Sequence, residues 1–180
     1  MRTPRFILIL LAIIVHFTGC YETSQDALNA EDYDGPIMEL DNIVFHFSDS
    51  AQVKAKGTSK KRMEYVNGDQ EYPQGLYLEF YDDNGVLEST IDANKAFYNK
   101  KEDWWRGREG VIVKRIATGE QLNTEELYWV PSEERIHTEK FATITRVDGV
   151  LYGTGLEAKQ DLSSYSIQNV KGDFPLEDVE

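Results

Sequence analysis

The sequence has little of what catalytic and metal sites are built from. Its one cysteine, Cys20, excludes a disulfide within the chain. The three histidines, His16, His46 and His137, are scattered and form no metal-ligand pattern. There is no Gly-x-Ser-x-Gly elbow and no phosphate-binding loop. The residues therefore indicate no catalytic site, no metal and no cofactor.

Long hydrophobic runs are also missing, with one exception. Phe6 to Phe17 is nearly all apolar, but it is shorter than the roughly 20 residues that a membrane-spanning helix needs. Arg2 and Arg5 precede this run, and Thr18-Gly19-Cys20 follows it. This order is typical of a secretory signal, and the small pair before the cysteine resembles a bacterial lipobox. We predict a signal peptide over residues 1–19 and lipidation of Cys20; an uncleaved short anchor or a chance cysteine are the alternatives.

Positive charge is scarce. Nineteen basic residues face 32 acidic ones, for a net charge of −13, and losing the two arginines of the signal makes the protein more acidic still. Such a body should not bind nucleic acid and should be repelled by anionic lipid surfaces. Any lipid that it carries must therefore be held by apolar contacts. Residues 20–36 are polar and acidic and read as a flexible tether, or else as an arm ordered on a partner; residues 37–180 suit a single domain.

Helical periodicity is absent after Pro36. Apolar residues alternate instead, as in Ile43-Phe45-Phe47 and Leu76-Leu78-Phe80, with turn signals such as Asn67-Gly68 and Asp148-Gly149 between the runs. This pattern predicts an all-β fold of antiparallel strands. Asp82-Asp83-Asn84-Gly85 is best read as a hairpin turn, because it lacks the distal glutamate of a calcium loop.

A degenerate repeat runs through the second half of the chain. Similar blocks begin at Ile91, Leu122 and Leu156, which are 31 and 34 residues apart. Periods of this size indicate stacked supersecondary units, here hairpins forming an elongated, folded-over sheet. The last unit should contain strands over 149–158 and 164–170, and the glycines at 153 and 155 predict a close approach of another segment to the strand.

Three features leave more than one interpretation open. Lys60-Lys61-Arg62 is a solvated strand face or a site for a phosphate or sugar acid. Of Trp104 and Trp105, one should pack inside and the other cover a rim, with a sugar-stacking platform as the alternative. Small residues near the repeat centres are either ordinary core or the lining of a groove that accepts acyl chains; they are Thr124, Thr138, Thr143, Gly153, Gly155 and Ala158.

Several spaced motifs together resemble one family. They are Gly85-x-Leu87, Ala93-x-x-Ala96-x-Tyr98, Leu122-x-Thr124-x-x-Leu127-x-Trp129, Ile136-x-Thr138, Gly153-x-Gly155-Leu156 and Leu162-x-x-Tyr165-x-Ile167-x-x-Val170-x-Gly172. Over residues 37–172 the chain resembles LptC, the periplasmic component of the lipopolysaccharide export system in the OstA-like superfamily. Two departures are a lipobox in place of the family's frequent transmembrane helix, and a poorly fitting segment over residues 49–73.

The resemblance implies a β-jelly-roll, or folded β-taco, with an apolar trough. Such a protein is no enzyme. It takes lipopolysaccharide from an inner-membrane ABC transporter, binds the acyl chains in the trough and passes the lipid to an LptA-like periplasmic bridge protein. We expect it to be periplasmic and anchored to the inner membrane through Cys20. The apolar strand residues expected to contact the lipid are Leu78, Phe80, Ile91, Leu122, Leu127, Ile136, Phe141, Ile144, Leu156 and Ile167.

Two other functions remain open from the sequence. One is a structural envelope adaptor that joins partners through its sheet edges and has a filled core. The other is a glycan hydrolase or carbohydrate binder that uses Trp104 or Trp105. A hydrolase would also need two carboxylates facing one cleft.

Overall fold

The fold is entirely β over the part of the chain that the computed structural model describes, residues 33–173. This confirms the predicted fold class. The strands are β1 (Met38–Asp49), β2 (Gln52–Glu64), β3 (Gln70–Tyr72), β4 (Leu76–Tyr81), β5 (Leu87–Asn99), β6 (Trp104–Arg115), β7 (Gln121–Val130), β8 (Arg135–Arg146), β9 (Gly149–Lys159), β10 (Tyr165–Ile167) and β11 (Lys171–Asp173). A 3₁₀ turn, Pro131–Glu133, joins β7 to β8.

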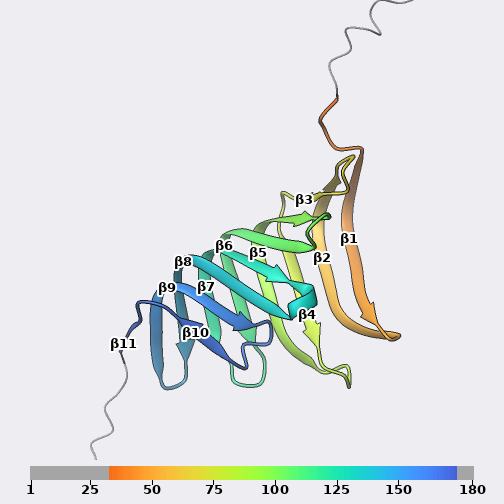
Figure 1. Cartoon of the computed structure of the whole chain (residues 1–180). Coiled ribbons are helices and arrows are strands. Elements are labelled where there is room, and N and C mark those ends of the chain that lie inside the picture. Colours follow the sequence, from red (N-terminus) through yellow and green to blue (C-terminus); the bar gives the residue numbers. More distant parts are fainter. Residues whose placement is uncertain (1–32, 174–180) are drawn as a thin grey trace, which may run out of the picture. The chain divides into compact units, whose positions relative to one another are not determined.

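All eleven strands belong to one antiparallel sheet. Its order follows the sequence, from β1 and β2 at one end to β9 and β10 at the other (Figure 1). At two positions in this order, two short strands lie end to end in the place of one long strand. β3 and β4 both lie between β2 and β5, whereas β10 and β11 both pair with β9. The predicted stacking of hairpins is therefore the observed topology.

The long strands are interrupted at one row, which we call the crease. The pairing register shifts between Ala93 and Lys95 in β5, and the same row contains the irregularities of the next three strands. These lie at 108–111 in β6, 124–128 in β7 and 138–141 in β8. A bulge bends its strand, so a row of bulges folds the sheet along a line. The crease divides the sheet into two leaves. The first leaf contains β4, β11 and the segments 87–93, 111–115, 121–124, 141–146 and 149–154. The second leaf contains β3, β10 and the segments 95–99, 104–108, 128–130, 135–138 and 156–159.

Polar side chains satisfy the backbone groups that the crease leaves unpaired. Ser59 Oγ donates to the carbonyl oxygen of Gly75 at 2.6 Å. Thr124 Oγ1 donates to that of Phe141 at 2.9 Å, and the backbone N–H of Lys140 donates to Thr138 Oγ1 at 3.1 Å. Buried polar groups need such partners. These hydroxyls therefore stabilise the fold line rather than leaving space beside it.

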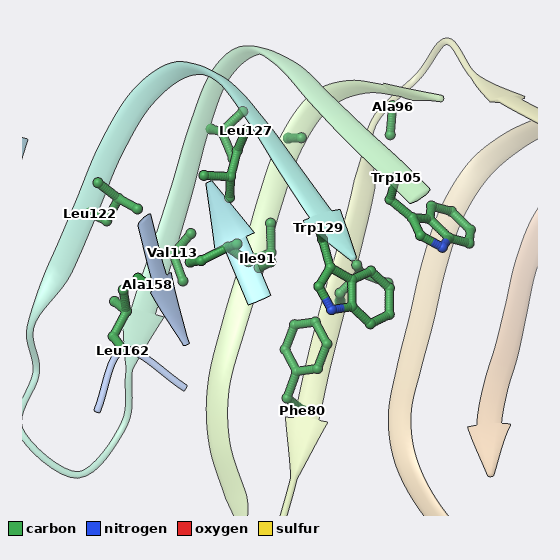
Figure 2. Close-up of a cluster of buried hydrophobic side chains, with 14 of the residues drawn as sticks. Phe80, Ile91, Ala96, Trp105, Val113, Leu122, Leu127, Trp129, Ala158 and Leu162 are labelled. Carbon is green, nitrogen blue, oxygen red and sulfur yellow. The ribbon is translucent and has the colours of Figure 1, made fainter. Parts of the chain in front are cut away.

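Aromatic side chains fill the interior at the β1 end. Trp105 lies between Phe45 and Tyr98, with ring centroids 6.0 and 4.5 Å away. Trp129 packs edge to face against Phe80 at 5.0 Å, so rings of both leaves meet (Figure 2). Burial, and then the carboxylate of Asp103, raise the pKa of Tyr98 to about 12. This end of the interior is closed by ring packing.

The structure confirms several local predictions and corrects one. Asp82 Oδ1 accepts hydrogen bonds from the N–H groups of Asn84 and Val86, as a hairpin turn requires. The third repeat, however, was aligned in the wrong register. Pairing across the sheet places Ile91 and Leu122 in one row with Leu151, not with Leu156, which lies beyond the crease.

Candidate functional site

The apolar side chains between the two leaves form the candidate site. Eight of the ten predicted lipid contacts are buried there: Leu78, Phe80, Ile91, Leu122, Leu127, Ile136, Ile144 and Leu156. A ninth, Ile167, is half-buried and packs against the same cluster. Figure 2 shows labelled members from several strands pointing toward one another. Alternation along the strands thus identified the interior correctly, while binding of lipid by these residues stays a prediction.

Phe141 does not reach this interior. Its side chain is 58% exposed and packs against Tyr152, with ring centroids 6.0 Å apart. Its neighbours Ala142 and Ile144 are fully buried instead. Phe141 and Ile144 are three residues apart, so one regular strand could not point both of them inward. Its assignment to the interior was therefore wrong.

The interior is packed rather than open. The space among Leu78, Ala93, Trp105, Leu127 and their neighbours amounts to about 20 Å³, enough for about one water molecule and far less than an acyl chain. Small residues do not widen it. Thr124 and Thr138 make hydrogen bonds to the backbone at the crease. Thr143 is half-buried outside the core cluster. At Gly153 there is no spare space, because a Cβ there would lie 2.5 Å from Ile167 Cγ2. Three of the six small residues, Thr138, Gly155 and Ala158, instead line the polar hollow at the β8–β10 end that is described below. A groove that accepts acyl chains therefore stays a prediction.

The two glycines of β9 do allow the close approach that the sequence predicted. Gln168 passes over both of them: its backbone oxygen would meet a Cβ at Gly153, and its side chain would meet one at Gly155. The backbone N–H of Gln168 donates to the carbonyl oxygen of Gly155 at 2.9 Å, and that of Thr154 donates to Gln168 at 3.1 Å. The segment after β10 therefore lies directly on β9.

The two tryptophans separate as predicted. Trp105 is buried, with only 4% of its surface exposed. Trp104 is half-buried on the other face, between Phe97 and Tyr128, and its Nε1 donates to Glu102 at 2.9 Å. Trp105 is thus covered by the core and offers no sugar-stacking surface in this structure.

The basic run at 60–62 belongs to a paired strand face. Lys61 Nζ lies 2.6 Å from Glu39 of β1, and Arg62 lies 3.4 Å from Glu64 of its own strand. These contacts favour the solvated strand face over an anion site. Among residues 33–173 no cluster of acidic, histidine or cysteine side chains could bind a metal ion.

A polar concavity of about 770 Å³ lies at the β8–β10 end. Arg135 contributes a cation to it but is already paired, with its Nε 2.6 Å from Glu133 and 3.9 Å from Glu157. Burial, and then Arg135, lower the pKa of His137 in the same wall. Four glutamates (133, 134, 139 and 157) outnumber Arg135 and Lys159 in the lining, so this hollow does not suit an anionic lipid headgroup.

The membrane anchor predicted at Cys20 lies outside the described residues, as do the signal peptide and most of the tether. No helix within residues 33–173 has the length and apolar character to cross a membrane. Lipidation and the division at residues 19 and 36 thus stay predictions.

Comparison with known proteins adds a family assignment. The family model of LptC-related lipopolysaccharide-assembly proteins matches residues 6–174. No curated protein sequence matches the chain significantly. Among solved structures, the chain is similar to LptH, the LptA-homologous periplasmic component of the lipopolysaccharide transport device of Pseudomonas aeruginosa, at 8% identity. The match covers 78% of this chain and 96% of that one, with a TM-score of 0.32. Since the family model spans nearly the whole sequence, the chain belongs to the LptC family and has a role in lipopolysaccharide transport.

Proposed function

We propose that the chain accepts lipopolysaccharide from an inner-membrane ABC transporter and passes it to an LptA-like periplasmic bridge protein. The observation that carries this proposal is the apolar interior, which continues across the stacked strands from Phe80 and Trp129 to Ile144 and Leu162. Burying acyl chains there would contribute about 25 cal/mol per Å² of apolar surface. The acyl chains lie between the leaves and the sugars remain in water.

Both ends of the sheet are available to neighbouring proteins. Among the described residues 33–173, β1, which is twelve residues long, pairs with β2 alone, so its other edge is open to a further strand there. β10 and β11 form the opposite edge. Adding a partner's strand to each edge would continue the interior into that partner. The transporter's ATP hydrolysis then supplies the energy, and an acyl group on Cys20 holds the chain at the inner membrane.

Site-specific photo-crosslinking tests lipid carriage. A crosslinker at Leu78, Ile136 or Leu156 should capture lipopolysaccharide in membranes supplied with ATP. Glu79 is the matched control, because it neighbours Leu78 on β4 but faces outward, where it pairs with Lys56 at 2.7 Å. Capture at Glu79 alone, or at none of the four positions, would contradict the proposal.

A structural adaptor is the second candidate, favoured by the close packing of the interior. In that case strand-edge crosslinkers on β1 and β10 would capture envelope proteins, while interior positions would never capture lipid. The same set of crosslinking variants therefore separates the two functions.

A further inference from the structure

The loop between β9 and β10, residues 160–164, bridges the two leaves on the side opposite the crease. Ser89 of the first leaf donates from its Oγ to the carbonyl oxygen of Gln160 at 2.8 Å. Trp129 of the second leaf donates from Nε1 to Gln160 Oε1 at 2.8 Å. The backbone N–H of Gln160 donates to Glu134 at 2.9 Å. The open sides of both leaves thus converge on one residue of this loop.

The same loop inserts an apolar side chain into the interior. Leu162 is 1% exposed and belongs to the core cluster, although Ser163 and Ser164 beside it are exposed (Figure 2). Its φ of 55° lies in the left-handed region that a leucine disfavours. Hydrogen bonds fix this turn: Leu162 N–H donates to Lys159 at 2.9 Å, and Ser163 N–H to Asp161 Oδ1 at 2.9 Å. An uncommon backbone conformation at a side chain that fills the interior indicates a functional element.

We propose that Leu162 occupies the position where an acyl chain enters between the leaves, and that loop 160–164 is a lid that the incoming chain displaces. This inference rests on the proposed lipid carriage and adds its entry point. The loop leads into β10, whose three pairs with β9 are flanked by one backbone hydrogen bond from Lys159 to Ser164 and by those of Gln168. The lid can therefore open at the Lys159–Ser164 end while Gln168 holds the segment on β9. Like charges also face each other here: Asp161 of the lid acts on Glu88 of the first leaf, and burial followed by Asp161 raises the pKa of Glu88.

Hydrogen exchange on the full chain gives the first test. Adding purified lipopolysaccharide should decrease the protection of the amides of residues 159–164, because the lid opens, while the paired amides of β6 and β7 keep theirs. Ligands ordinarily increase protection, so the opposite sign at one loop is specific to the proposal. Increased protection of the lid together with the rest of the interior would overturn it.

Equilibrium binding of radiolabelled lipopolysaccharide gives the second test. Leu162→Ala removes the side chain that fills the entry position. It should tighten binding about tenfold, since a closed state lowers apparent affinity by the fraction of molecules that are open. Leu156→Ala is the matched control: this leucine is also buried in the second leaf but only lines the interior, so its loss should weaken binding.

Ser89→Ala is the second variant, and it loosens the lid without removing apolar surface. It should also tighten binding, even if Leu162→Ala does not fold. Weaker binding by both lid variants, or no change in either, would make Leu162 an ordinary core residue and overturn the lid. If lipopolysaccharide binds to no variant and not to the natural chain, the proposed function itself fails.

Discussion

At the scale of single residues, the hydroxyl of Thr124 in β7 links this strand to β8 at the crease. It is 7% exposed and donates to the carbonyl oxygen of Phe141, which has no pairing partner on the β7 side of the crease. Thr124→Val keeps the shape and removes the donor, so we expect a loss of about 1–3 kcal/mol in the free energy of unfolding. Urea denaturation measures it. Thr143→Val, half-buried beside the crease, should change stability by less than about 0.5 kcal/mol; equal losses in the two variants would contradict this role.

His137 makes stability depend on pH. Burial and Arg135 lower its pKa, and Arg135 Nη1 lies 3.2 Å from His137 Nδ1. A guanidinium can only donate, so Nδ1 accepts and the ring is neutral. The unfolded chain therefore binds the proton first as pH falls below the ordinary histidine value of about 6.5, and stability decreases from there downward.

Thermal unfolding between pH 7.5 and 5.5 checks this. His137→Gln should flatten the decrease in melting temperature over that range. His46→Gln, on an exposed position of β1, is the control. If the decrease in melting temperature disappears in the His46 variant and persists in the His137 variant, the pH dependence does not come from His137.

Where a strand is regular, the sequence pattern predicts which residues point into the interior; where a strand contains a bulge, it does not. Leu76, Leu78 and Phe80 alternate without interruption in β4, and all three are buried. Phe141 follows a bulge, which changes the face to which the next side chains point. Its apolar side chain alone therefore predicted the wrong face. Leu162 was missed as an interior residue because it lies in a polar loop. Its burial depends on the turn that its N–H closes onto Lys159 and on packing against the core, which no local pattern records.

At the scale of elements, Gly153 determines whether the chain after β10 can lie on β9. A Cβ at this position would collide with the backbone oxygen of Gln168 and with Ile167. Gly153→Ala should therefore displace the segment 165–169 and expose it, while β5 to β8 stay folded. Limited proteolysis should find new cleavage there. Thr154→Ala, at the exposed neighbouring position, is the control; resistance to cleavage in the Gly153 variant would contradict the prediction.

Strands and turns could be predicted from sequence, but the bulges could not. Turn residues such as Asp82 and Gly85 act through local backbone geometry, which the sequence states directly. The bulges of β6 to β8 depend on how neighbouring strands register with one another. The third repeat was misaligned for this reason, because its Leu156 lies on the far side of the crease from Ile91 and Leu122.

At the scale of the whole molecule, the net charge of −13 affects how fast an anionic lipid arrives. Like charges slow the encounter, and salt screens them, with a Debye length of about 30 Å at 0.01 M and 8 Å at 0.15 M. The association rate of lipopolysaccharide should therefore rise with NaCl over this range. Stopped-flow measurements would detect it. A rate that falls with salt would mean that a local cationic surface attracts the lipid.

The crease also determines how the fold can change in size. β5 to β8 all bend at the same row, so the cross-section is set by strand length and the extent along the stack by strand number. Nine strand positions at about 4.8 Å give an interior of roughly 40 Å. Inserting one more hairpin with a bulge at that row would extend the apolar interior by about 10 Å and leave its cross-section unchanged. The architecture is thus modular, and duplicating a unit is a simple route to carriers of different reach.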